Sequence, residues 1–153
     1  MTATEWRAGL AAAAACLVGV GLARFAYTPL VPALINAHWL DAGEAGYLGA
    51  ANFTGYLAGA FLARILAHRL APSLLLRVMM LVTSIGFFAC AIPLSFPWLA
   101  LWRGLAGFSG AVLMVLAAPT VLPMITPARR GFIGGIIFTG VGLGIMISGL
   151  LVP

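Results

Sequence analysis

Long apolar stretches separated by short polar breaks run along the whole chain. Five such stretches cover residues 10–35, 45–66, 74–92, 98–122 and 131–152. Each is close to the roughly 20 residues that an α-helix needs to cross the hydrocarbon core of a bilayer. They are too long and too uniformly apolar for barrel strands, and isolated strands would leave backbone amides unpaired in lipid. The pattern predicts an all-α fold, a polytopic membrane helix bundle of five spans in one domain.

The breaks between these stretches contain residues that end and begin helices. They lie at residues 36–39, 72–73, 93–97 and 127–130, and three of them contain proline. Asp41 and Glu44 have the spacing of a capping box, in which two carboxylates meet the free amides at a helix start. We expect this cap at the start of the second helix, without a catalytic or proton-carrying role for either acid.

Composition places the chain in lipid rather than water. Hydrophobic residues make up 63% and charged residues 7%, against about 25% charged in an ordinary soluble domain. The mean hydropathy is +1.14. A water-soluble fold of this length has too little interior to bury so much apolar surface. The lipid bilayer is therefore the expected environment.

The net charge of +5 comes from arginine alone and predicts the orientation. The breaks at 36–44 and 93–97 contain no Arg or Lys. Six arginines flank the N-terminus or the other breaks: Arg7, Arg64, Arg69, Arg77, Arg129 and Arg130. By the positive-inside rule, the N-terminus and these breaks are cytoplasmic in a multi-pass protein of a bacterial inner membrane. No basic cluster contains interleaved aromatic residues, so nucleic acid is not an expected partner.

Two further arginines, Arg24 and Arg103, lie within the apolar stretches. An ionised side chain at such depth costs at least ~2.5 kcal/mol and tends to face protein or water on a transport pathway. The five spans contain no aspartate or glutamate, so a cavity shared by both guanidinium groups would attract anions. We expect Arg24 and Arg103 to contact either an anionic substrate or a carboxylate in a part of the protein outside these five spans. In the alternative interpretation, each guanidinium reaches the outer lipid headgroups or bonds carbonyls left free by Pro29 and Pro32.

Polar side chains near these arginines complete a candidate substrate site. Tyr27 and Thr28 share a helix face with Arg24, and Asn52 and Tyr56 lie one turn apart on the second span. We expect them to contact a small solute. An interhelical hydrogen bond is an equally good interpretation of Asn52 and Tyr56.

Small residues repeat at helical spacing and indicate close helix packing. Ala51, Gly55, Gly59 and Ala63 recur every four positions on the second span. On the fifth span, three alternating glycines provide a packing seam or a point at which the helix bends during gating: Gly140, Gly142 and Gly144.

Nothing in the chain predicts an enzyme, a cofactor or a metal site. His38 and His68 lie in breaks on opposite sides of the predicted membrane. Cys16 and Cys90 lie in apolar stretches without acidic or histidine neighbours at ligand spacing, so we interpret them as small buried hydrophobes. The chain has no Gly-x-Ser-x-Gly motif and no phosphate-binding loop after a strand.

Several segments together resemble the YbfB/YjiJ-type branch of the major facilitator superfamily. They are 21–32 (GLARFAYTPLVP), 44–60 (EAGYLGAANFTGYLAGA), 140–144 (GVGLG) and 148–149 (SG), and the likeness covers nearly the whole chain. Arg103-x-x-x-Gly107 is similar to the arginine motif of the superfamily's fourth helix. The sequence departs from the superfamily pattern at Ala63, where an aspartate is usual, and in lacking the internal proline of the fifth helix.

The resemblance implies a secondary transporter with twelve helices in two halves, which moves a small solute by alternating access. Because five spans are predicted here, we expect a truncated N-terminal portion whose partners are the missing C-terminal helices or an oligomeric partner. The alternatives are a non-transporting membrane module or assembly subunit, and a five-helix transporter active only as an oligomer.

Overall fold

The computed structural model describes residues 2–92 and 94–151. These residues are helical with short connections, and the described part of the chain contains no strand. The predicted all-α class is confirmed. Residues 1, 93, 152 and 153 lie outside this description, and with them the last residue of the expected span 131–152.

The first span is a long rod made of four segments: α1 (Ala3–Cys16), the π-helix η1 (Leu17–Leu22), α2 (Ala23–Phe25) and α3 (Tyr27–Asn36). Its 34 residues correspond to about 50 Å at ~1.5 Å per residue, longer than the ~30 Å hydrocarbon core. The rod bends at Ala26, between α2 and α3. Pro29 explains the bend, because its ring clashes with the carbonyl group four residues earlier in a straight helix.

The second helix, α4 (Ala42–Arg69), begins at the predicted capping box. The Asp41 carboxylate accepts a hydrogen bond from the Glu44 amide (2.7 Å), and the Glu44 carboxylate accepts one from the Asp41 amide (3.0 Å). Both acids therefore satisfy free amide groups at the helix start, as the spacing predicted.

Three further α-helices follow, with two 3₁₀ turns in the last connection. They are α5 (Pro72–Cys90), α6 (Phe96–Val121), η2 (Leu122–Met124), η3 (Pro127–Arg129) and α7 (Arg130–Leu151). Proline stands in the first turn of α5 and α6, where the missing N–H costs nothing. These helices overlap the expected spans 74–92, 98–122 and 131–152, and the bounds of the spans stay a prediction.

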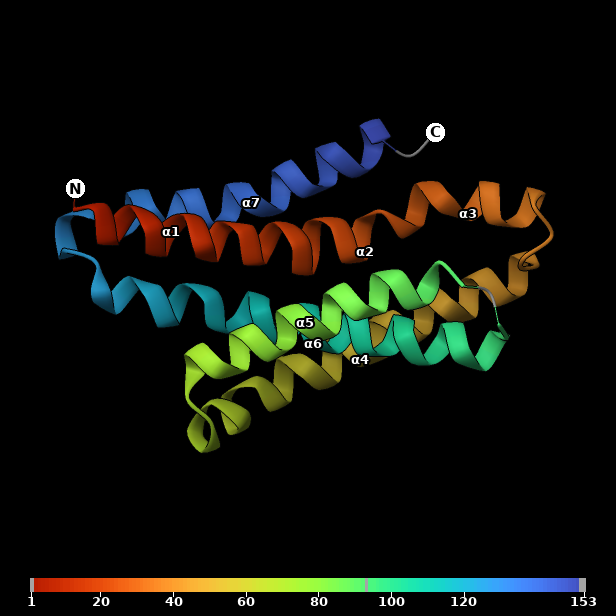
Figure 1. Cartoon of the computed structure of the whole chain (residues 1–153), viewed down its shortest axis with the longest axis horizontal. Coiled ribbons are helices and arrows are strands. Elements are labelled where there is room, and N and C mark those ends of the chain that lie inside the picture. Colours follow the sequence, from red (N-terminus) through yellow and green to blue (C-terminus); the bar gives the residue numbers. More distant parts are fainter. Residues whose placement is uncertain (1, 93, 152–153) are drawn as a thin grey trace.

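Four helical stretches of the described chain are long and apolar enough to cross a membrane: Ala3–Asn36, Pro72–Cys90, Phe96–Met124 and Pro127–Leu151. At 28 residues α4 has the length but is not among them, because Asn52, its tyrosines and its many glycines lower its hydropathy. The predicted span over residues 45–66 therefore stays a prediction. The course of α4 beside α6 is compatible with it (Figure 1).

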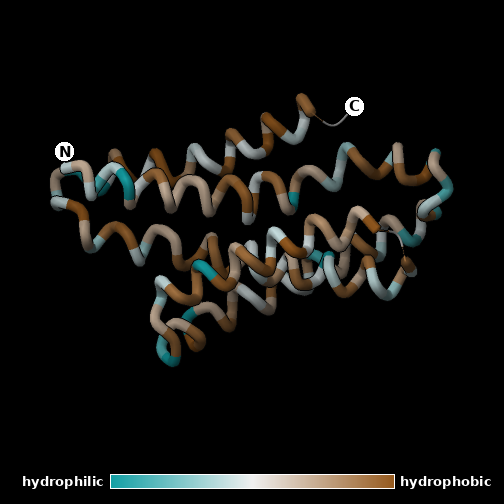
Figure 2. The backbone as a smooth tube through the Cα atoms, viewed as in Figure 1, coloured by the Kyte–Doolittle hydropathy of each residue, from teal (hydrophilic) through white to brown (hydrophobic). Residues whose placement is uncertain are grey.

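The connections alternate between the two ends of the bundle (Figure 1). The N-terminus lies at the same end as the α4–α5 and α6–α7 connections, and the α3–α4 and α5–α6 connections lie at the other. Hydrophilic positions gather mainly near these ends, whereas the middle of each helix is largely apolar (Figure 2). The arginine-bearing breaks thus share one end of the molecule.

Helix α6 is the centre of the bundle and contributes the largest number of buried residues. Helices α4 and α5 pack against α6, and α7 packs against α1 and η1. One apolar core cluster joins α1, α6 and α7 through Cys16, Ala117 and Ile133. Between α5 and α6, the buried hydroxyl groups of Thr83 and Ser109 form a hydrogen bond of 2.8 Å.

Glycines stand where helix backbones approach most closely. A Cβ atom on Gly55 would collide with the carbonyl of Gly104, and one on Gly140 with the carbonyl of Ala13. Similar collisions would occur at Gly59, against Phe108, and at Gly144, against Gly21 and Leu17. At Gly142, no described atom lies within 4 Å of the added Cβ, so packing does not require a glycine there.

Candidate functional site

A cavity of about 400 Å³ lies between the first span, α4 and α6, and we call it the arginine cavity. Five of the six residues expected to contact a solute line it; only Tyr56 does not. Its lining comprises Arg24, Phe25, Tyr27, Thr28, Val31, Pro32, Gly49, Asn52, Phe53 and Arg103.

The Arg103 side chain is buried, with 9% of its surface exposed. Its guanidinium lies over the Tyr27 ring, 4.1 Å from the centroid, and its Nη1 donates a hydrogen bond of 3.1 Å to the Ala23 carbonyl. The Nε–H has no acceptor among the described residues. Arg103 is therefore held in place by an aromatic face and a carbonyl oxygen, and at least one of its five N–H donors has no partner among the described residues.

Arg24 is half-buried and surrounded by aromatic rings. Its guanidinium carbon lies 4.5 Å from the Tyr56 centroid, 4.6 Å from that of Phe53 and 5.8 Å from that of Phe25. Cation–π contacts of this kind contribute about 0.5–2 kcal/mol, more where water is excluded. Tyr56 thus contributes to the site by contacting Arg24, although it does not line the cavity.

The side chains of Asn52 and Tyr27 form hydrogen bonds between the helices that line the site. The buried Asn52 side chain donates a hydrogen bond of 2.9 Å from Nδ2 to the Arg103 carbonyl, so the interhelical bond considered for Asn52 is present. The Tyr27 hydroxyl donates one of 3.0 Å to the carbonyl of Ala45. Asn52 also lines the arginine cavity, so a structural role and a solute contact are compatible.

A second cavity, of about 200 Å³, lies between the first span, α4, α5 and α6, and we call it the apolar cavity. It shares Tyr27 and Arg103 with the arginine cavity. The rest of its lining is almost entirely apolar: Ala23, Ala26, Leu30, Leu34, Trp39, Leu40, Leu48, Phe87, Cys90, Ala91 and Leu99.

The electrostatic character of both cavities is cationic. Neither contains an aspartate or glutamate among its described lining residues, so Arg24 and Arg103 face no carboxylate there. Within the described residues, no group of three His, Cys, Asp or Glu side chains could hold a metal ion. Cys16 and Cys90 are free thiols. The arrangement is suited to binding an anion.

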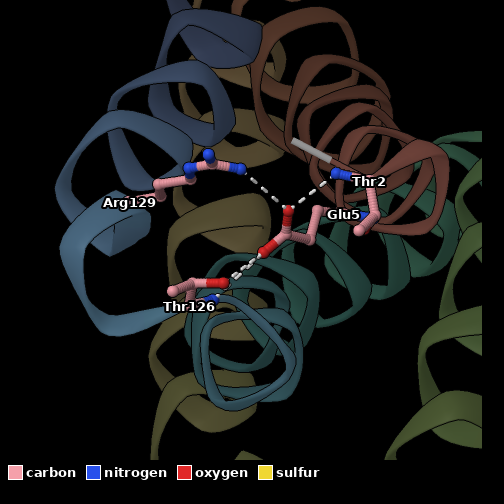
Figure 3. A network of polar contacts seen from close by, with 4 residues as sticks. All are labelled: Thr2, Glu5, Thr126 and Arg129. Carbon is pink, nitrogen blue, oxygen red and sulfur yellow. Dashed lines mark hydrogen bonds and ion pairs between the residues drawn. The ribbon is translucent and has the colours of Figure 1, made fainter.

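Sequence reasoning missed a polar network at Glu5 (Figure 3). Glu5 is 7% exposed, and its carboxylate accepts hydrogen bonds from the Thr126 hydroxyl (2.8 Å) and amide (3.2 Å). It also accepts one from the Thr2 amide (2.9 Å) and forms an ion pair with Arg129 (3.4 Å). The start of α1 is thereby joined to the α6–α7 connection. Thr2-x-x-Glu5 has the same capping-box spacing that identified Asp41 and Glu44, and could have indicated half of this network.

The long apolar helices define a multi-pass helical membrane protein. The sequence model of the family described as "Uncharacterised MFS-type transporter YbfB" matches residues 16–153, so the chain belongs to this family of major facilitator transporters. No match is found among the curated proteins or among the solved structures. The family expected from the sequence is confirmed, and membership indicates a transporter rather than an enzyme.

Proposed function

We propose that this transporter is a secondary active transporter that moves a small anionic solute across a bacterial inner membrane by alternating access. The observation that carries the proposal is that Arg24 and Arg103 line one cavity with no acidic residue in its described lining. Family membership supports transport in general, and the charge of the cavity supports an anionic solute.

Two fixed cations attract an anion more strongly where water is scarce than they do in bulk water. At about 4 Å and an effective dielectric constant near 20, two unit charges attract by about 4 kcal/mol, against about 1 kcal/mol in water. A planar guanidinium can also bind a carboxylate through two parallel hydrogen bonds. We infer that Arg103 supplies such a contact while Arg24, held by Phe53 and Tyr56, raises the local concentration of anions.

A non-transporting assembly module is less well supported. Its glycine seams would have to be free for partner helices, but Gly55 and Gly59 are already in contact with α6. Likewise Gly140 and Gly144 are in contact with the first span. The seams therefore hold this chain's own helices together.

Uptake by cells that express the protein tests the proposal. We expect accumulation of at least one labelled carboxylate, such as acetate, butyrate, succinate or gluconate, above that of cells without the protein. Arg24→Gln and Arg103→Gln each reduce it by about ten-fold or more, since 1.4 kcal/mol of lost binding is ten-fold. Arg77→Gln is the matched control, because Arg77 is exposed and lies outside both cavities. Uptake of neutral solutes only, or equal uptake by all variants, would contradict the proposal.

The N-terminus is proposed to be cytoplasmic, because the arginine-bearing connections share its end of the bundle. A reporter active only in the cytoplasm should be active when fused after Arg69 and inactive when fused after Asn36. The reverse pattern would invert the topology.

A further inference from the structure

Tyr27 and Arg103 are the two residues that line both cavities. The arginine cavity is also lined by Arg24, Thr28 and Asn52, and the apolar cavity is also lined by leucine, phenylalanine and alanine side chains. A single ligand bound at Arg103 could therefore have a charged end in one cavity and a second part in the other. The chemistry of that second part is set by the apolar cavity.

Arg103 has the capacity to hold the charged end. One of its five N–H donors is used by the Ala23 carbonyl, and the buried Nε–H has no described acceptor. A charge in such dry surroundings attracts an opposite charge more strongly than one in water does. Because Arg103 lines both cavities and is more deeply buried than Arg24, we infer that an anion is bound most tightly at Arg103.

The apolar cavity is unsuited to a polar ligand group. Its volume of about 200 Å³ corresponds to roughly six or seven waters at about 30 Å³ each. The Tyr27 hydroxyl already donates to Ala45, and aliphatic and aromatic carbons form most of the remaining lining. A sugar hydroxyl placed here would lose its water partners without replacement, whereas an alkyl or aryl group would gain by leaving water.

We propose that the ligand is an amphipathic monocarboxylate, with its carboxylate at Arg103 and an apolar tail of a few carbons in the apolar cavity. This inference rests on the proposed function, since it specifies the solute class of the same site. It adds that affinity depends on the length of the tail as well as on the charge.

Calorimetric titration of the purified protein in nanodiscs with acetate, butyrate, hexanoate and neutral hexanamide tests the proposal, with empty nanodiscs as the reference. Affinity should rise about four-fold with each added methylene, as for transfer of a methylene out of water. Hexanamide should bind at least about ten-fold more weakly than hexanoate, because it lacks the charge that Arg103 recognises.

Filling the apolar cavity tests the contribution of the tail to the affinity separately from that of the charge. Ala26→Leu places extra carbons in the cavity, and should abolish the gain from acetate to hexanoate, weakening hexanoate binding far more than acetate binding. Ala33→Leu is the matched control, because Ala33 is exposed on the same helix and lines neither cavity. Should Ala26→Leu fail to fold, Ala91→Leu fills the same cavity from the exposed end of α5.

The outcomes distinguish the two proposals. If the carboxylates all bind with one affinity that Arg103→Gln abolishes, the tail inference is wrong and the anion site stands. If hexanamide binds as tightly as hexanoate, the charged end is not recognised and the inference is also wrong. If no carboxylate binds the wild-type protein, the proposed function itself fails.

Discussion

The side-chain amide of Asn52 on α4 donates a hydrogen bond of 2.9 Å to the main-chain carbonyl of Arg103 on α6. The bond lies where Gly107 lets the two backbones approach, because a Cβ atom on Gly107 would collide with the Asn52 carbonyl. The position of the buried arginine is thus set by the packing of α4 on α6.

We expect Asn52→Leu to destabilise the protein by about 0.6–1.7 kcal/mol, which are the average and the largest values measured for hydrogen bonds between membrane helices. The same change should weaken carboxylate binding, because Arg103 loses the contact that fixes its backbone. Thermal unfolding in detergent and calorimetric titration measure the two effects. Asn36→Leu, at the exposed end of α3, is the control for replacing an asparagine. Wild-type stability and affinity in Asn52→Leu would show that this bond does not position Arg103.

The glycine seams predict a sharp contrast between substitutions on one helix. Gly140→Ala places a Cβ against the Ala13 carbonyl, and should cost about 1–3 kcal/mol because a backbone must move. Gly142→Ala, two residues further along α7, has open space among the described residues and should leave stability unchanged or slightly higher. Unfolding curves of both variants in one detergent compare them directly, and equal stability of the two would contradict the helix packing.

Loss of the Glu5 carboxylate should loosen the backbone locally, at the end of the bundle where α1 meets the α6–α7 connection. Glu5→Gln removes the charge paired with Arg129 and weakens the bonds to Thr126, so amide exchange should increase across residues 122–129. Glu44→Gln alters an equivalent capping box at the exposed start of α4 and is the matched control. Hydrogen exchange read by mass spectrometry measures both, and unchanged protection at 122–129 in Glu5→Gln would rule out this role.

Much of the fold follows from hydropathy and helix signals. The apolar stretches predicted the helices, and Asp41 with Glu44 predicted the start of α4, because these signals act within a few residues of chain. The bend at Ala26 and the π-helical turn at Leu17–Leu22 were not predicted. The bend has a local cause at Pro29, whereas the π-helical turn contains Gly19 and Gly21, which lie close to Leu113 of α6 and Gly144 of α7. That packing is not visible in the local sequence.

The candidate site was predictable in part. The cost of placing arginine in lipid identified Arg24 and Arg103 as candidate site residues, and both line one cavity in the structure. The aromatic cage around Arg24 and the contact of Glu5 with Thr126 join residues far apart in sequence, and no local pattern encodes their distances. The apolar cavity likewise arises only when α3, α4, α5 and α6 are assembled.

The proposed function requires that Arg24 and Arg103 face a water-filled, anion-attracting cavity rather than lipid. The most direct test is the reaction of a single cysteine at position 28, Thr28→Cys, with Cys16 and Cys90 replaced by alanine. Thr28 is exposed and lines the arginine cavity. Phe88→Cys, at a side chain 78% exposed on α5, is the lipid-facing control.

We predict that an anionic methanethiosulfonate reacts with Thr28→Cys about ten-fold or more faster than a cationic one of similar size, because a cavity lined by one sign of charge concentrates the opposite ion. Phe88→Cys should react with neither, since a thiol in hydrocarbon does not ionise. No reaction at position 28, or a faster reaction with the cationic reagent, would contradict the account.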